Sequence, residues 1–184
     1  AAEHRKELLL QHGPAQAGQG WIHRELSGEG NARRSNEQIK YLIGIGQMGV
    51  DVIGDSPTQS MLDPDHPLVK NSVGTQGVSL CCSRDYLDLY GGIPFDKVSV
   101  SNSVPSVFSM TGLCIALRES GFPPDRARGS VLQAPLYAED CSYSAGMPHL
   151  LVNRIALDGM SFAAKHLPRF HAYVEDTYFF SETG

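Results

Sequence analysis

Short strand-like segments alternate with longer helical segments along most of this chain, and this alternation restricts the fold more than any other feature. Alternating apolar and polar residues predict strands, whereas an apolar stripe at helical spacing predicts helices. The predicted strands are Met48–Ile53, Gly77–Cys82, Lys97–Val104, Gly129–Gln133 and Ala172–Glu175, and the predicted helices are Asn31–Ile45, Arg84–Tyr90, Pro105–Ser120 and Met147–Leu167. We therefore predict an α/β fold with about four parallel βα units, which is either half of a TIM-type (β/α)8 barrel or a small open sheet.

The first 20 residues differ from the rest of the chain. Charged residues precede a run of three leucines that ends at Leu10, and no small-residue cleavage site follows, so we predict an amphipathic helix and not a signal peptide. Gly13–Gly20 has the composition of a flexible linker. Residues 1–20 are thus expected to form a helix and a linker, and residues 21–184 a partial barrel. Within that barrel, Trp21–Gly30 is predicted to be irregular and Asp55–Ser72 a long polar loop.

The composition argues against several classes of protein. The 184 residues carry a net charge of −5 without a run of basic residues, which argues against nucleic acid as the main partner. No apolar stretch reaches the roughly 18 residues of a membrane span. The four cysteines predict reduced thiols in a cytoplasmic protein. The seven histidines show no metal-binding spacing, so no metal site is expected.

Three local patterns resemble functional motifs but lack their context. Gly44–Gly49 matches G-x-G-x-x-G, yet it follows a predicted helix and enters a predicted strand, which is the reverse of a dinucleotide site. Ser142–Gly146 resembles a nucleophile elbow but has serine in place of the first glycine. Asp63, Asp65 and His66 lie in D-P-D-H-P, where such side chains usually form turn hydrogen bonds.

Polar residues also occur within and directly after the predicted strands. Asp51 lies in the apolar segment V-D-V, where it either faces a pocket or faces outward by strand alternation, and alternation makes the second at least as probable. Polar side chains follow two strands, at Asp55–Thr58 and Asn102–Ser106. Ligands bind at this carboxyl edge in both barrels and open sheets, so we expect the site there.

A series of short motifs occurs in a fixed order along the chain. The main ones are GQMG at Gly46–Gly49, DSPTQ at Asp55–Gln59, DPDHP at Asp63–Pro67, GIPFDKVS at Gly92–Ser99 and GS at Gly129–Ser130. In this order, and with nearly constant spacing over residues 21–184, they resemble the substrate-binding barrel of the cobalamin-dependent acyl-CoA mutases, the family of methylmalonyl-CoA mutase. The resemblance implies a barrel threaded by the pantetheine arm of an acyl-CoA.

The resemblance also implies a cofactor and partners. In this family, adenosylcobalamin on a separate domain or subunit starts radical chemistry, while the protein binds the substrate and excludes water. The chain resembles about half of the barrel and lacks the cobalamin-ligand motif D-x-H-x-x-G. It is therefore expected to be a fragment, a split subunit or a degenerate paralogue. Because a half barrel exposes sheet edges, we expect it to form an oligomer or to pair with another chain.

Several site residues follow from the resemblance. Arg24 occupies the place of an arginine that contacts CoA, and Ser101, Ser103 and Ser130 occupy places of hydroxyls that contact the substrate. Tyr178 is expected, with its neighbour Phe179, to line the reacting end of the substrate.

Other positions depart from the family pattern. Around the acyl group, Leu26 takes the place of a tyrosine, Leu132 of a glutamine, and Ser142 of the arginine that binds a substrate carboxylate. Phe179 takes the place of the histidine that binds the thioester carbonyl. Gly54 replaces an aromatic residue near the corrin, and Gln76 is also expected to contact the cofactor. Without the arginine, a diacid such as methylmalonyl-CoA is a poor substrate, and a more apolar acyl group fits better. Loss of the histidine removes a donor worth ~3 kcal/mol. The alternative is therefore a non-catalytic subunit that supports an active partner.

Overall fold

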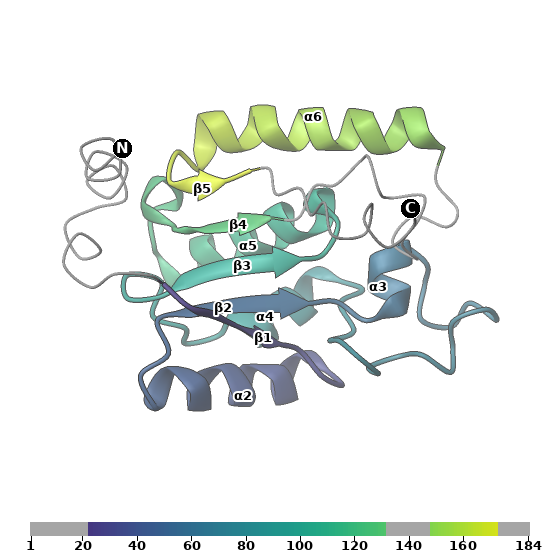
Figure 1. Cartoon of the computed structure of the whole chain (residues 1–184), viewed down its shortest axis with the longest axis horizontal. Coiled ribbons are helices and arrows are strands. Elements are labelled where there is room, and N and C mark those ends of the chain that lie inside the picture. The colour runs from purple at the N-terminus through teal and green to yellow at the C-terminus, as the bar shows by residue number, and fades with distance from the viewer. Residues whose placement is uncertain (1–21, 132–147, 173–184) are drawn as a thin grey trace, which may run out of the picture.

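The computed structural model describes residues 22–131 and 148–172, and its core is a parallel sheet (Figure 1). Five strands pair in the order β1-β2-β3-β4-β5, and all of the pairs are parallel. The strands are β1 Arg24–Ser27, β2 Gly49–Ile53, β3 Ser99–Ser103, β4 Gly129–Val131 and β5 Phe170–His171. The helices are α2 Ala32–Gly44, α3 Ser56–Ser60, α4 Ser83–Tyr90, α5 Ser106–Ser120, the short 3-10 helix Pro124–Arg126 and α6 His149–His166.

The helices cover one face of this sheet. In Figure 1, α4 and α5 lie behind the strands, and α2 and α6 flank them at the bottom and the top. Neighbouring helices pack in the order α2, α4, α5 and α6. No helix of the described residues lies on the face of the sheet toward the viewer, and we call this face the open face. The prediction of an α/β fold with parallel βα units is thus confirmed, and the arrangement is that of a partial TIM-type barrel.

The apolar core forms where alternate strand residues meet the helices. Val50, Val52, Val100 and Val131 are at most 2% exposed, and they belong to one apolar cluster with helix residues. The helix residues of this cluster are spaced one turn apart, as Leu113 and Leu117 are on α5. Side chains alternate along a strand, so the residues between these valines must point to the open face.

The side chain of Asp55 holds together the long segment that follows β2. This side chain is fully buried and caps α3, since one carboxylate oxygen accepts the Thr58 amide at 2.9 Å. The other oxygen accepts the Gly74 amide at 2.7 Å. Gly77 lies against the Gly54 backbone so closely that a Cβ atom would have no room. The DSPTQ motif therefore holds the carboxyl edge of the sheet together.

Some predicted elements were wrong or displaced. The segment Trp21–Gly30 was predicted to be irregular, but it contains β1. The expected polar loop over residues 55–72 begins with the short helix α3. Residues 77–82 do not form the predicted strand, because only Val78 makes bridges, to Gly30 and Gly54.

One further element, the last strand, can be compared with its prediction. The last strand is β5, which starts two residues before the expected Ala172, and residues 173–175 lie outside the described part. The expected helix and linker over residues 1–20 also lie outside it. Among the described helices, none combines the length and the apolar character that crossing a membrane requires.

Candidate functional site

The register of the sheet brings a row of polar side chains onto the open face. Leu26 pairs with Asp51, Asp51 with Ser101, Ser101 with Ser130, and Ser130 with His171. Paired residues of neighbouring parallel strands point to the same face. Five strands thus place their side chains at one level, and all except Leu26 are polar.

Arg24 lies two residues before Leu26 on β1, so it is on the same face, and its side chain reaches across the sheet. Its guanidinium donates to the hydroxyl of Ser99 from Nε at 3.2 Å and from Nη2 at 3.0 Å. Ser99 is on β3, so the side chain passes over β2, where Gly49 occupies the intervening position. A Cβ atom on Gly49 would lie 2.8 Å from the Arg24 Cγ. Gly49 therefore leaves the space through which Arg24 extends.

Asp51 is the charged partner on the same face. Ser103 donates its hydroxyl to Oδ2 of Asp51 at 3.1 Å, but Oδ1 is buried and has no hydrogen-bond partner among the described residues. Burial raises the pKa of Asp51, while the hydrogen bond from Ser103, the Arg24 charge and the nearby Ser101 hydroxyl oppose this rise. Burial likewise lowers the pKa of Arg24, and Asp51 opposes that change. A buried carboxylate oxygen without a partner costs free energy, and a ligand donor that reached it would recover that cost.

Two serines form the centre of the row. The hydroxyls of Ser101 and Ser130 are in direct hydrogen-bond contact, and Ser101 is also 3.3 Å from the Ser130 carbonyl oxygen. Both residues are buried. The resemblance assigned these two residues and Ser103 to the substrate, and the structure places all three on the open face with Arg24.

Leu26 is the apolar residue at this level. It is 60% exposed on the edge strand β1, beside Asp51 in the register. A large exposed apolar side chain next to a carboxylate would gain free energy if a ligand or another chain covered it. The remaining expected substrate and catalytic residues, Leu132, Ser142, Tyr178 and Phe179, lie outside the described residues.

The two residues expected to contact a cofactor occupy different surroundings. Gly54 is buried. A Cβ atom on Gly54 would lie 2.9 Å from a methyl carbon of Thr58 and 3.1 Å from a methyl carbon of Val104. Gln76 is exposed in the loop that follows α3, with a φ of 58°. Of the two, Gln76 can offer a side-chain amide to a large ligand above the sheet, whereas Gly54 can offer backbone atoms only.

Two sequence interpretations outside this site can be compared with the structure. The interpretation of Gly44–Gly49 is confirmed, and the turn interpretation of D-P-D-H-P is confirmed for the His66 side chain. His66 and Asp63 form a turn, in which the His66 amide donates to the Asp63 carbonyl at 2.9 Å and the Leu68 amide donates to the His66 ring nitrogen at 3.3 Å. The glycine-rich segment Gly44–Gly49 ends helix α2 and enters β2, so it does not have the strand-to-helix order of a dinucleotide site.

Sequence reasoning did not select two residues of the site, Asp51 and Ser99. The V-D-V pattern around Asp51 signalled an unusual carboxylate, but alternation alone did not show which side of the sheet was open. Ser99 had no signal of its own because its role depends on Arg24, which is 75 positions away in the sequence.

Comparisons with known proteins agree with this architecture. Residues 13–184 match the protein family described as Methylmalonyl-CoA mutase. The chain is 31% identical over 167 residues to the 2-hydroxyisobutanoyl-CoA mutase large subunit of Aquincola tertiaricarbonis. The aligned region covers 89% of this chain and 30% of that protein. It is 30% identical to the methylmalonyl-CoA mutase large subunit of Streptomyces virginiae, over 90% of this chain and 23% of that protein.

A more distant relative shows the same pattern. Mitochondrial methylmalonyl-CoA mutase of Homo sapiens is 28% identical over 89% of this chain and 22% of its own length. The chain thus spans less than a third of the length of these relatives. The parallel βα units and the family match over residues 13–184 lead to one conclusion: the chain belongs to the methylmalonyl-CoA mutase family.

Proposed function

We propose that this chain forms part of the substrate-binding barrel of a cobalamin-dependent acyl-CoA mutase, which rearranges the carbon skeleton of an acyl-CoA. The observation that carries the proposal is the polar row on the open face, where Arg24, Asp51 and the three serines lie together. In a complete barrel this face would be the interior, which is where a threaded acyl-CoA would lie.

Arg24 and the three serines each have a part in the proposed binding. Arg24 binds an anionic or carbonyl oxygen of the CoA moiety through charge-assisted hydrogen bonds. Ser101, Ser103 and Ser130 hydrogen-bond the thioester end, with Tyr178 and Phe179 lining the reacting carbons. Leu132 and Ser142 complete the acyl pocket, and Gln76 with the Gly54 backbone faces the cofactor. Adenosylcobalamin, when bound, supplies the organic radical that begins the rearrangement.

The acyl group would be largely apolar and would carry one hydrogen-bond donor. Leu26 supplies apolar surface beside Asp51, whose free Oδ1 needs a donor. The relative from Aquincola tertiaricarbonis is named for 2-hydroxyisobutanoyl-CoA, an acyl group with two methyls and one hydroxyl. We therefore propose a short, branched hydroxyacyl-CoA, with its hydroxyl donating to Asp51.

The proposed enzyme would need further protein. Strands β1 and β5 end the described sheet, so the rest of a barrel must pair with them. A cobalamin-binding domain or subunit would cover the carboxyl edge, and the assembly would be an oligomer. We also propose that it acts in the cytoplasm, without a role in membrane or nucleic-acid binding.

One observation favours the non-catalytic alternative. Both carboxylate oxygens of Asp55 are used to hold the loops, so the DSPTQ motif has a structural role whether or not catalysis occurs. A subunit that only supports an active partner would therefore keep this motif and still lose substrate-binding groups.

Turnover by the assembled enzyme separates these functions. The chain, its barrel-completing and cobalamin-binding partners and adenosylcobalamin would be incubated with a branched hydroxyacyl-CoA or with its deoxy analogue. We expect isomerised product, and about a tenfold or greater preference for the hydroxylated ester, because one hydrogen bond to a charged group contributes about 1.5 kcal/mol or more. Asp51→Ala should abolish this preference, whereas Asp65→Ala, at an exposed loop position, should keep it.

The outcomes distinguish the two parts of the proposal. Product without a hydroxyl preference would overturn the assignment of Asp51 and keep the mutase function. Absence of both product and acyl-CoA binding by calorimetry would leave only the supporting subunit.

A further inference from the structure

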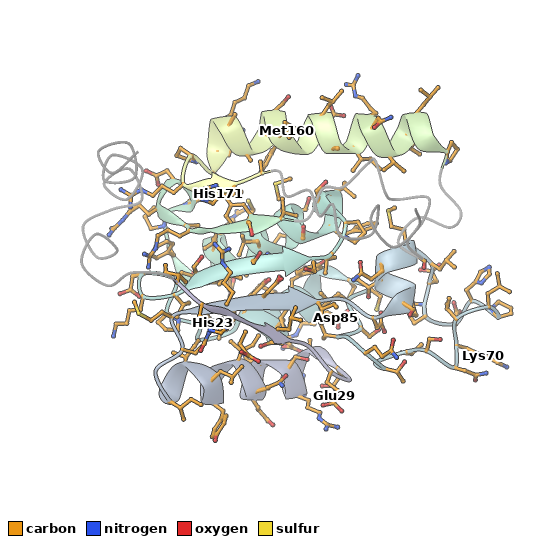
Figure 2. The ribbon with its side chains drawn as sticks, in the orientation of Figure 1. His23, Glu29, Lys70, Asp85, Met160 and His171 are labelled. Carbon is orange, nitrogen blue, oxygen red and sulfur yellow. The ribbon has the colours of Figure 1, made fainter. Side chains whose placement is uncertain are left out.

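A second cluster of ligand-type side chains lies at the start of α4, away from the row on the open face. Cys81, Cys82 and Asp85 place two Sγ atoms and a carboxylate oxygen within 4.8 Å of one another. Both cysteines are free thiols and exposed. Figure 2 labels Asp85 close to the arrowhead of β2 in this view. Among the described residues this is the one such group of three.

Local backbone geometry holds the cluster together. The amides of Cys81 and Cys82 both donate to Oδ2 of Asp85, at 2.9 and 3.0 Å, which fixes the carboxylate at the first turn of the helix. The two thiols lie 3.2 and 3.4 Å from the same oxygen. Neighbouring side chains of an extended chain point to opposite sides, but here the turn into α4 brings both sulfur atoms to one carboxylate.

The cluster adjoins a cavity on the helical side of the sheet. This cavity has a volume of about 480 Å³ and is lined by Cys81, Cys82, Leu62, Tyr86 and Phe108 among others. Because both cysteines line the cavity, it leaves space next to the cluster for a ligand atom or a water molecule.

A nucleophilic role for these thiols fits poorly. Both sulfur atoms lie against the negatively charged carboxylate of Asp85, whereas reactive cysteines lie beside positively charged groups that favour the thiolate. Two thiols and a carboxylate are instead a ligand set that zinc-like ions prefer. Tetrahedral coordination, with metal–sulfur bonds near 2.3 Å and metal–oxygen bonds near 2.1 Å, puts ligand atoms about 3.5–3.8 Å apart. Small side-chain rotations reach these separations from the observed cluster.

We propose that Cys81, Cys82 and Asp85 bind one thiophilic divalent cation of the zinc class. Three protein ligands leave a fourth coordination position on the ion. The adjoining cavity provides the space for a water molecule or a ligand atom at that position. The site is independent of the mutase function, because none of its residues belongs to the open face.

The test is a titration of the full chain with Zn²⁺ and with Cd²⁺ in the presence of a non-chelating reductant. Calorimetry reports stoichiometry and affinity, and the ultraviolet charge-transfer absorption of Cd²⁺ reports sulfur ligation. We expect one ion per chain. Cys81→Ser and Cys82→Ser should each weaken binding at least about 100-fold, and Asp85→Asn about tenfold. Serine is itself a good helix N-cap, so Cys82→Ser should stay folded.

The matched control removes the other thiols. A Cys114→Ser and Cys141→Ser double variant should bind Cd²⁺ with unchanged affinity and unchanged charge-transfer absorption. Absence of one-to-one binding by the wild-type chain would overturn the proposal. Binding that persists in both Cys81→Ser and Cys82→Ser, or that disappears in the double control, would overturn it as well.

Discussion

Gly129→Ala should lower the free energy of unfolding by about 3 kcal/mol or more, because β3 and β4 approach each other too closely for a side chain at this position. A Cβ atom on Gly129 would overlap the Val100 carbonyl and lie 2.5 Å from Phe170 Cε2. The first of these neighbours is backbone in the sheet and cannot rotate away. Urea unfolding of the full chain, followed by circular dichroism, measures this change.

A second glycine provides the matched control. Gly44 is the last residue of α2, and nothing lies within 4 Å of the place its Cβ would take. Gly44→Ala should therefore raise the free energy of unfolding by about 0.5–1 kcal/mol, through the higher helix propensity of alanine. Equal stability of Gly129→Ala and the wild type would contradict the β3–β4 packing described above.

Arg24→Met should weaken acyl-CoA binding by about 10–100-fold, since hydrogen bonds to a charged group contribute about 1.5–3 kcal/mol each. Methionine keeps much of the apolar length of arginine but removes the charge and all five donors. The affinity of Arg24→Lys should lie between those of the wild type and Arg24→Met, because a lysine presents a point charge and not a planar group with five donors. The measurement is calorimetric titration of the assembled enzyme with an acyl-CoA.

The control for this prediction is another arginine with a carboxylate partner. Arg33 pairs with Asp88 at 3.0 Å on the helical side, and its side chain is 74% exposed. Arg33→Met should leave acyl-CoA affinity unchanged, because exposed pairs contribute little and this one is away from the open face. An Arg24→Met variant that binds as tightly as the wild type would remove Arg24 from the proposed site.

Elements with regular periodicity could be predicted from the sequence. The predicted helix Pro105–Ser120 corresponds closely to α5, whose buried residues recur one turn apart, and the valines of β2 alternate as expected. β1 was missed because the segment R-E-L-S at the sheet edge has three half-buried or exposed residues and no apolar alternation. Residues 77–82 carry the composition of a strand, but Gly77 packs directly on the Gly54 backbone, so the segment crosses the loops and does not join the sheet.

The site was predictable where it depends on single positions and not where it depends on register. The resemblance indicated Arg24 and the three serines, and the sheet brings them onto one face. To assign Asp51 to the site, one must know which face of the sheet the helices leave uncovered. That face is determined by the packing of α2, α4, α5 and α6 on the opposite side. A pattern with period two defines two faces of a strand but does not say which one is covered.

The central claim, that an acyl-CoA lies along the open face, is tested most directly by photoaffinity labelling. An acyl-CoA with a photoreactive acyl group would be bound to the assembled enzyme and irradiated, and the labelled peptides mapped by mass spectrometry. The account predicts labels on peptides that contain β1, β2 and β3, and loss of those labels when unmodified acyl-CoA competes. Labels confined to the outer helices α2, α4 and α5, or labels that no acyl-CoA displaces, would contradict it.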